Sequence, residues 1–423
     1  MPRSTPLPPA GRRAWLVCLG CALALFTVMG LGVNAFAVYQ PYLLELEGFT
    51  NAQGSWITTV RSLFGTLSMA TADALCRRYG LRRVIAAGLG CFVLSYALFG
   101  AAHSFSSYCA AAVFSGLAYG YGGMVPLTLV IARWFQDRRG FALGLMAAGT
   151  GISTILSPPL LTRAIQGAGL RFAFWAEGGI GLVLTLLAVL LIRDQPADVG
   201  LSPYTAGGPR QEVPVPERER PAALPPVIWW AAVAAAFFTG GPCGPGFSHL
   251  TVLYTAEGYD SGTVALMLSY FGIILMASKV LFGVLSDRLG SRAANYCAFG
   301  VGMLGMGLCC LSCVHSVPLA VIALTCTALG MPLSSVSLSV WAGDLSSGQN
   351  YDRLVKWLST SYMLGALVTG PVPGILADRF GSYIPAYALF LLCLLCSMVL
   401  IQGVYLKLGV GKRPGRSPKN ASL

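Results

Sequence analysis

The chain has 423 residues, of which 55% are apolar and 10% charged, with a mean hydropathy of +0.69. This composition excludes an ordinary water-soluble enzyme and predicts an all-α integral membrane protein. The formal net charge of +12 would suit a nucleic-acid-binding protein only if the basic residues were gathered on one soluble surface.

Twelve apolar segments are long enough to cross about 30 Å of hydrocarbon, which takes about 20 helical residues. We expect them at 14–39, 53–76, 83–102, 106–132, 139–165, 171–192, 227–253, 261–286, 292–312, 317–342, 355–377 and 382–406. The first is too long for a signal-peptide core and has no clear cleavage site, so it is expected to be retained.

A long polar segment separates the sixth and seventh of these spans. It is rich in proline, glycine and alternating charge, as is typical of a solvated linker. The predicted organisation is a six-helix half, a cytoplasmic linker, a second six-helix half and a cytoplasmic tail, at 1–192, 193–226, 227–406 and 407–423.

The basic residues follow the predicted topology. With both termini in the cytoplasm, about 23 of the 28 Lys and Arg lie in cytoplasmic segments and about 3 outside, as the positive-inside rule prefers. The segment 40–52 carries Glu45 and Glu47 without a basic residue, which agrees with an outer loop. We therefore expect a plasma (inner) membrane protein in contact with the lipid bilayer, and no nucleic-acid partner.

The 13 cysteines lie almost wholly within the predicted spans. Three Cys-x-x-Cys spacings occur there without a histidine or acidic partner, so we interpret them as packing residues and expect no metal site. The chain also lacks a credible Ser/His/Asp set, phosphate loop or pair of carboxylates. We therefore expect no cofactor and no enzymatic activity.

The two halves of the chain look like copies of each other. The stretch DALCRRYGLR (73–82) follows the second span, GVLSDRLGSR (283–292) follows the eighth, and four positions match at one constant offset. Asp137-Arg138 precedes a proline at nearly the same interval as Asp352-Arg353 does. Many secondary transporters are built from repeated halves that hold the substrate near the midplane between them.

The pattern Gly-x-Leu-x-Asp-Arg-x-Gly-x-Arg at 283–292 resembles the signature loop of the major facilitator superfamily. ARWFQDRRGFALGLMAAGTGISTILSPPL (132–160) and GPVPGILADRFGSYIPAY (370–387) resemble its monocarboxylate transporter and oxalate/formate antiporter branch, with weaker support from SWI (55–57) and LSSV (333–336). The resemblance implies the major facilitator fold, with 12 transmembrane helices in two six-helix halves around a central cavity, and a small carboxylate substrate.

Arg61 and Lys279 interrupt apolar segments, where a charged side chain costs roughly 2.5 to 3.5 kcal/mol on insertion scales. Two such cations suggest a path for an anion. By the resemblance, the substrate-binding cation lies in the eighth span shortly before the signature glycine, where Lys279 precedes Gly283 by four residues; the family usually has arginine there. An ammonium group could hold a carboxylate and also release a proton. Snorkelling of Lys279 to the interface is the alternative. For Arg61, substrate binding, an outer-gate ion pair and snorkelling stay equally open.

Departures from the branch restrict the substrate. The oxalate/formate antiporters carry a second lysine in the eleventh span, and residues 360–371 have none, which favours a monoanion. Monocarboxylate transporters tend to have an aspartate one turn before the eighth-span cation and a lysine in the first span. Here Leu275 occupies the position of the aspartate. The first span has Asn34 and Tyr39 as its polar candidates in place of the lysine. Coupling to protons or to a counter-anion therefore stays open.

Other polar residues are weaker candidates for the substrate site. A carboxylate could accept hydrogen bonds from Tyr119, Tyr121, Ser334 and Ser337, although small polar residues also serve helix packing. The seventh span contains GGPCGPG (240–246), where two prolines predict a broken helix. Broken helices at membrane depth are tolerated beside a cavity, so Phe247 and Cys243 could border the pathway, and a kink without substrate contact is equally open.

Glu177 and His249 are proton-coupling candidates besides Lys279. The alternative for Glu177 is a structural ion pair with Arg171 or Arg163, and the alternative for His249 is ordinary packing. Ion pairs and helix-end contacts of the signature loops could close an inner gate. The gating candidates are Gly283, Asp287, Arg288, Gly290, Arg292, Asp137 and Arg138.

We therefore predict a monomeric alternating-access transporter of a small organic monocarboxylate such as lactate, pyruvate or formate, working by proton symport or anion exchange. The alternatives are an exporter of drugs or amphipathic compounds, an oxalate/formate-type exchanger, and a membrane sensor that uses a transporter fold without flux.

Overall fold

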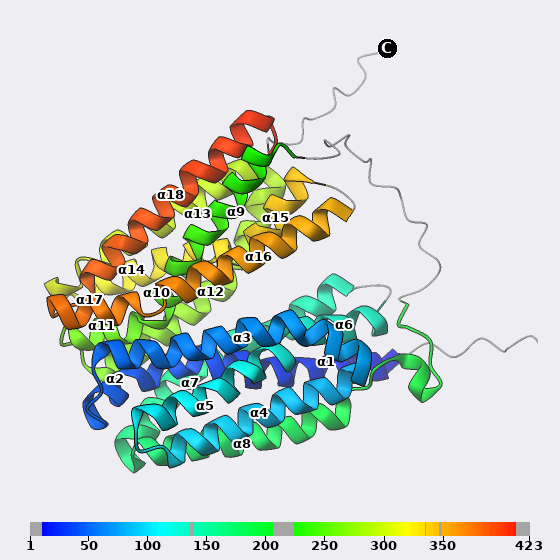
Figure 1. Cartoon of the computed structure of the whole chain (residues 1–423), viewed down its shortest axis with the longest axis horizontal. Helices are drawn as coiled ribbons and strands as arrows, with labels where there is room; N and C mark the ends of the chain where they lie inside the picture. The colour runs from blue at the N-terminus through cyan, green and yellow to red at the C-terminus, as the bar shows by residue number, and fades with distance from the viewer. Residues whose placement is uncertain (1–10, 136–138, 206–223, 335, 347–348, 412–423) are drawn as a thin grey trace, which may run out of the picture. The chain divides into compact units, whose positions relative to one another are not determined.

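The computed structural model describes residues 11–135, 139–205, 224–334, 336–346 and 349–411, and these are mostly helical (Figure 1). Within these ranges an isolated β-bridge joins Phe135 and Tyr204. By internal packing the chain divides into two compact units: unit 1 comprises 1–214 and 250–272, and unit 2 comprises 215–249 and 273–423. The predicted division at 192 and 226 stays a prediction.

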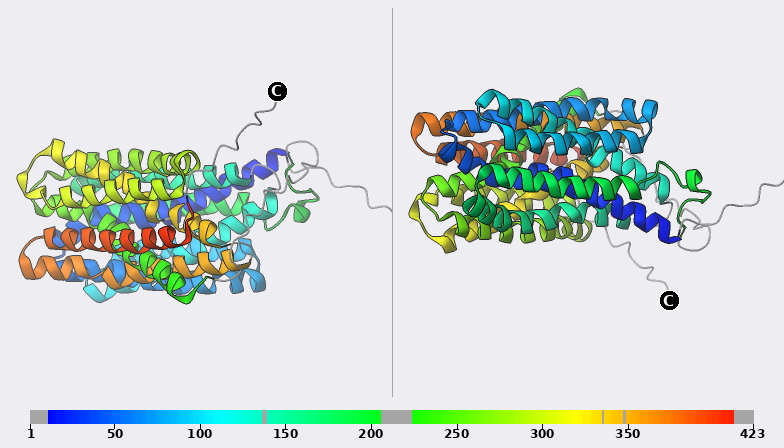
Figure 2. Two further views of the ribbon diagram at one scale, coloured as in Figure 1. Left: turned by 90° about the horizontal axis from the view of Figure 1, so that it is seen from above. Right: turned by 90° about the horizontal axis from the view of Figure 1, so that it is seen from below.

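Unit 1 is a bundle of long helices that lie side by side (Figures 1 and 2). Its helices are α1 (Gly11–Leu25), the π-helix η1 (Phe26–Ala35), α2 (Phe36–Leu46), α3 (Asn51–Tyr79), α4 (Leu81–Ala101), α5 (Phe105–Tyr121), α6 (Met124–Trp134), α7 (Arg139–Ala168), α8 (Leu170–Leu191), the 3₁₀ turn η2 (Pro196–Val199) and α11 (Leu250–Ala256). The first turns of α12 (Ser261–Leu289) also belong to it.

Unit 2 contains the rest of α12 and a second bundle. Its other helices are α9 (Pro226–Cys243), α10 (Pro245–Ser248), α13 (Ser291–Cys309), η3 (Ser312–Val314), α14 (Val317–Gly330), η4 (Met331–Ser334), α15 (Val336–Leu345), α16 (Gln349–Thr369), α17 (Val372–Phe380) and α18 (Ile384–Leu408).

Each predicted span coincides with one helix or with a run of consecutive helices. In the described part of the chain, ten of these stretches are long and apolar enough to cross a membrane. The other two are α3, which carries Arg61 and charged residues near its end, and α13, which carries Arg292 and Asn295 in its first two turns. The all-α membrane fold is confirmed, and the total of twelve spans is consistent with these helices.

Several spans are broken rather than continuous. The predicted break in the seventh span is confirmed: α9 ends at Cys243, and Gly244 has φ −99° and ψ −91° before α10 begins. Further interruptions were not predicted. They are the π-helix in the first span, the step from α5 to α6 at Gly122–Gly123, the 3₁₀ turn η4 in the tenth span and the step from α16 to α17 at Gly370–Pro371.

The internal repeat extends to the backbone of the corners that follow the second and eighth spans. Gly80 joins α3 to α4 with φ +88°, and Gly290 joins α12 to α13 with φ +90°. A side chain would clash with the backbone at such angles, which explains why glycine occupies both places.

Each of these corners is hydrogen-bonded to a segment that follows a later long helix of the same unit. In unit 1 the amide of Arg82 donates to Oδ1 of Asp194 at 2.6 Å, just after α8. In unit 2 the amide of Arg292 donates to the carbonyl oxygen of Gly411 at 3.1 Å, just after α18. The first turn of α4 and of α13 thus gains an acceptor for one of the amides that a helix start leaves without an intrahelical partner.

Glycines let particular helix pairs approach closely. A Cβ added at Gly116 of α5 would lie 2.4 Å from the carbonyl oxygen of Arg61 in α3, and one at Gly120 would lie 2.5 Å from the nitrogen of Met69. In unit 2 a Cβ at Gly365 of α16 would lie 1.9 Å from the carbonyl oxygen of Phe237 in α9. Small residues at such contacts are typical of helix packing in membranes.

We predict that Gly365→Ala lowers the thermal unfolding temperature of the purified protein in detergent. The added methyl group meets backbone that cannot rotate away, and overpacking of this kind costs typically about 1–3 kcal/mol. Gly403→Ala is the control, because a Cβ at Gly403 of α18 meets nothing within 4 Å. Equal unfolding temperatures for the two variants would contradict the described α9–α16 contact.

Candidate functional site

The first span contains a π-helix, η1, in place of regular α-helix. Wide turns of this kind are rare and are frequent at functional sites. A Cβ added at Gly30 would lie 2.5 Å from Cβ of Ser153 in α7, so glycine allows the close approach of these two segments. Side chains from other helices bind this stretch: Nη1 of Arg61 donates to the carbonyl oxygen of Gly32 at 3.1 Å, and the hydroxyl of Tyr96 donates to that of Leu31 at 3.0 Å.

Arg61 is buried inside unit 1, with 7% of its surface exposed. Its guanidinium carbon lies 4.9 Å from the centre of the Phe36 ring, a cation–π contact. Among the residues that the structure describes, Arg61 has no acidic partner, so the outer-gate ion pair gains no support there. The guanidinium has five N–H donors, and one of them is used by the carbonyl oxygen of Gly32. A carboxylate could accept hydrogen bonds from the other donors.

Asn34 lies two residues beyond the carbonyl that Arg61 binds. Its Nδ2 donates to Oγ1 of Thr154 in α7 at 2.8 Å, and the side chain is half-buried. Asn34 and Arg61 therefore hold opposite neighbours, α7 and α3, against the same irregular stretch of the first span. Of the two polar candidates in the first span, Asn34 lies in the π-helix and Tyr39 lies beyond it in α2.

Tyr39 and Glu177 form a buried pair between α2 and α8. The tyrosine hydroxyl donates to Oε2 of Glu177 at 2.5 Å, and the tyrosine ring stacks on Phe174 with 4.1 Å between ring centres. Tyr39 has no exposed surface and Glu177 has 2%. Arg171, the expected ion-pair partner of Glu177, contacts His103 instead at 2.6 Å.

Tyr119 and Tyr121 of α5 are half-buried. The ring of Tyr119 packs against Gly65 of α3, where a Cβ would lie 3.2 Å from its Cδ1 atom. The hydroxyl of Tyr121 lies 3.1 Å from Oγ1 of Thr71. Both rings therefore contact α3, the helix that carries Arg61.

In unit 2, Lys279 lies on an exposed face of α12, while its neighbour Ser278 and, one turn on, Phe282 are buried. The structure shows no hydrogen bond or ion pair of the ammonium group with the residues it describes. A Cβ added at Gly283, one turn after Lys279, meets no heavy atom within 4 Å, so the face is open there. This placement fits a substrate contact and also fits snorkelling.

The remaining candidates of unit 2 are engaged with nearby backbone. His249 has no exposed surface, and its Nδ1 lies 2.9 Å from the carbonyl oxygen of Pro245. Phe247, in α10, is half-buried. The hydroxyls of Ser334 and Ser337 donate to the carbonyl oxygens of Met331 at 2.7 Å and Leu333 at 3.0 Å.

The gating candidates are only partly described. Gly290 and Arg292 form the corner of unit 2, and the side chain of Arg288 is exposed near the end of α12. The side chain of Asp287 and residues Asp137 and Arg138 lie outside the part of the chain that the structure describes. Closure of an inner gate by these residues stays a prediction.

Residues that sequence reasoning did not single out complete the site in unit 1. They are Gly32, Phe36, Tyr96 and Thr154, which bind or contact the candidate side chains. A signal existed in the glycines that alternate with other residues before Asn34 in the first span, because glycine there favours irregular backbone. The partners themselves carry no local signal.

Comparison with known proteins gives the chain a context. It matches the family described as the Major Facilitator Superfamily over residues 20–347. It is similar to monocarboxylate transporter 12 of Homo sapiens, at 26% identity over 436 aligned positions that cover 94% of this chain and 81% of that protein. It is also similar to the aspyridones efflux protein apdF of Emericella nidulans, at 26% identity over 68% of this chain; that match spans 56% of the efflux protein.

Solved structures share the fold at low sequence identity. The nucleoside transporter NupG matches with a TM-score of 0.71 and 10% identity, over 92% of this chain and 99% of that one. A bacterial homologue of the human lysosomal transporter Spinster, in an inward-facing and unoccupied conformation, matches with a TM-score of 0.68 and 14% identity, over 96% of this chain and 100% of that one.

We predict that Tyr39→Phe lowers thermal stability by about 1–3 kcal/mol, because it leaves a buried carboxyl oxygen of Glu177 without its hydrogen-bond donor. Adding Glu177→Met should recover part of the loss, since replacing both partners by apolar groups can be nearly neutral. Tyr296→Phe, at an exposed tyrosine of α13, is the control. Thermal unfolding in detergent measures all of these, and an unchanged Tyr39→Phe variant would contradict the pair.

Proposed function

Because the chain belongs to the major facilitator superfamily, we propose that it carries small organic monocarboxylates, of the size of lactate, pyruvate or formate, across the plasma membrane by alternating access. The similarity to monocarboxylate transporter 12 over 94% of the chain supports this substrate class. The two cations that interrupt apolar stretches, Lys279 and Arg61, also support an anionic substrate.

Lys279 carries the proposal. It lies in the middle of α12 on an exposed face, and its ammonium group has no acidic partner among the described residues. A charge in an apolar helix is kept where it has a polar role, and the binding of a carboxylate is such a role. The proposed mechanism is that Lys279 binds the carboxylate while the two halves of the transporter expose it to either side in turn.

Arg61 is proposed as a second contact for the substrate. Its guanidinium is anchored on the carbonyl of Gly32 and on the ring of Phe36, which fixes its orientation. A cation held in this way is pre-organised for an anion, because it loses little rotamer freedom on binding. Asn34 and Tyr119 come from neighbouring helices of unit 1 and are proposed to add polar contacts.

The coupling is proposed to be either proton symport or exchange for another anion. Glu177 is a candidate proton carrier, because it is a buried carboxyl whose described partner is a tyrosine hydroxyl and not a cation. His249 and Lys279 are the other candidates. In the proposed topology both termini are cytoplasmic, as the distribution of Lys and Arg favours, and the protein works as a monomer without a cofactor.

Export of larger amphipathic compounds is the second candidate function. The similarity to the aspyridones efflux protein apdF favours it. In that case Lys279 would place its charge at the membrane interface and would not touch the substrate.

We predict that Lys279→Gln reduces uptake of radiolabelled lactate or pyruvate into proteoliposomes by about tenfold or more, since a charge-assisted hydrogen bond to the carboxylate is lost. Lys279→Arg should retain part of the uptake. Lys407→Gln, at an exposed lysine in the last turn of α18, should leave uptake unchanged and serves as the control. Full uptake by Lys279→Gln would exclude the assigned role and favour the export function.

The coupling is resolved in the same vesicles. Uptake driven by an inward proton gradient indicates symport, and uptake only into vesicles preloaded with a carboxylate indicates exchange. Formate and oxalate extend the series: oxalate transport at the rate of lactate transport would contradict the preference for monoanions. Absence of flux for all four acids would contradict the proposed function as a whole.

A further inference from the structure

Aromatic side chains of unit 1 pack around Glu177. The rings of Tyr39 and Phe174 stack with 4.1 Å between their centres, and Tyr96 and Phe99 pack on Phe174 at 6.1 and 5.3 Å. These four side chains are 0% exposed, and Glu177 is 2% exposed. The Oε1 atom of Glu177 is buried and has no hydrogen-bond partner among the described residues. The carboxyl group is therefore shut off from water.

The arginines closest to Glu177 in sequence do not neutralise this carboxyl group. Arg171 is bound to His103 at 2.6 Å, and Arg163 is exposed. The titratable groups on the elements around Glu177 are Tyr39 of α2, Tyr96 of α4, Tyr108 of α5, Arg163 of α7 and Arg171 of α8, with Glu47 and His103 beyond the helix ends. An ionised carboxylate without a cation is far costlier to bury than a neutral one, so this arrangement favours a protonated Glu177.

Two rings of α2 connect Glu177 with Arg61. The hydroxyl of Tyr39 binds Glu177, and the ring of Tyr39 lies 6.1 Å from that of Phe36. The guanidinium carbon of Arg61 lies 4.9 Å from the centre of the Phe36 ring. An ionised Glu177 would balance the charge of Arg61 inside the same bundle, whereas a protonated Glu177 leaves that positive charge without a counter-ion.

From this arrangement we propose that Glu177 is the proton site of a proton symporter, and that its proton is coupled to the binding of the carboxylate substrate at Arg61. The inference rests on the proposed carboxylate transport and decides its coupling. An unbalanced charge in a membrane interior is costly, so a proton on Glu177 favours an anion at Arg61. By linkage, the bound anion then favours the proton by the same factor.

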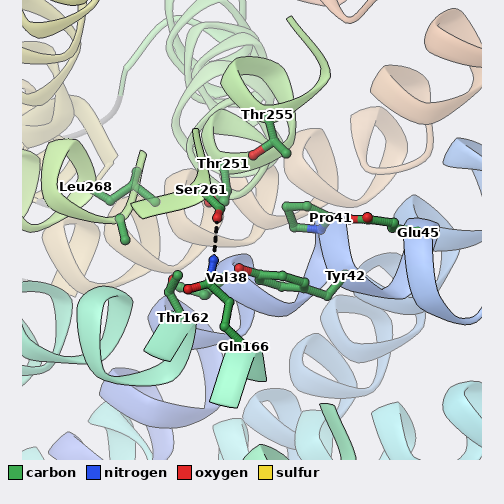
Figure 3. Close-up of a pocket in the computed structure, with 11 residues that line it drawn as sticks. Val38, Pro41, Tyr42, Glu45, Thr162, Gln166, Thr251, Thr255, Ser261 and Leu268 are labelled. Atoms are coloured by element: carbon green, nitrogen blue, oxygen red, sulfur yellow. Dashed lines mark hydrogen bonds between the residues drawn. The ribbon is translucent and has the colours of Figure 1, made fainter. Parts of the chain in front are cut away.

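The helix α2 gives this coupling a structural route. A tyrosine hydroxyl both donates and accepts, so Tyr39 can stay bound to Glu177 in either protonation state. The other face of α2, with Val38, Pro41 and Tyr42, lines a pocket of about 260 Å³ (Figure 3). One face of α2 thus contacts the Glu177 pair and the other borders open space, so a shift of the pair changes a wall of that space.

Transport by Glu177→Gln in proteoliposomes tests the proton site. Glutamine keeps the shape of the protonated side chain and an oxygen that can accept from Tyr39, but it cannot release a proton. We expect lactate accumulation driven by an inward proton gradient to fall by about tenfold or more. Exchange of labelled for preloaded lactate should continue at close to the wild-type rate. Glu257→Gln, at a half-buried carboxylate after α11, is the control and should retain both activities.

Binding of lactate to the purified full chain tests the link to Arg61. Titration calorimetry compares about pH 6 with about pH 8, where a carboxylic acid with a pKa of about 4 stays ionised, so the substrate itself adds no pH dependence. We expect wild-type binding to be about tenfold tighter at the lower pH. Heats in two buffers of different ionisation enthalpy should show that lactate binding takes up protons. Glu177→Gln should bind equally at both pH values, and Arg61→Gln should bind weakly with a smaller pH difference.

The outcomes separate this inference from the proposed function. Wild-type accumulation by Glu177→Gln, or wild-type binding that takes up no proton and does not change with pH, would overturn the inference and leave carboxylate transport standing. An unchanged pH dependence in Arg61→Gln would overturn the link to Arg61. Absence of lactate binding and flux in the wild type would overturn both. Should Glu177→Gln fail to fold, the pH dependence and proton uptake of the wild type decide the question.

Discussion

The hydrogen bonds of the first span's backbone are the constraint on which unit 1 depends. Hydrocarbon offers no donors or acceptors, so a backbone carbonyl that leaves the α-helical pattern must find a partner within the protein. The carbonyls of Leu31 and Gly32 find theirs in Tyr96 and Arg61, which come from α4 and α3. The irregular stretch therefore sets where these helices lie and where the guanidinium of Arg61 is held.

Much of the architecture could be predicted, because length and apolarity alone decide whether a helix can cross a membrane. The predicted spans coincide with helices, and the prolines of the seventh span correctly indicated the break after Cys243. The π-helix and the interruption at Gly122–Gly123 were missed. A glycine permits irregular backbone without requiring it, so its occurrence in a span does not determine the conformation.

Tertiary partners could not be predicted. Tyr39 and Glu177 are 138 residues apart, and the nearby arginines made an ion pair the simpler expectation for the glutamate. Only the packing of α2 against α8 brings the tyrosine hydroxyl to the carboxyl group. For Lys279 the clearer signal lies in the sequence, because a charge in an apolar segment singles it out. The structure adds that it lies on an exposed face of α12, and its contact with a substrate stays a prediction.

The glycine contacts between α3 and α5 have a mechanical consequence. Gly116 and Gly120 bring the two helices together at backbone distance over more than one turn, and the ring of Tyr119 packs on Gly65. Such close backbone contact leaves little room for one helix to slide along the other, so we expect α3 and α5 to move together and Arg61 and Tyr119 to keep their spacing. A molecule that contacts both Arg61 and Tyr119 would then be selected by its fit to a fixed surface, and not by a rearrangement of α3 against α5.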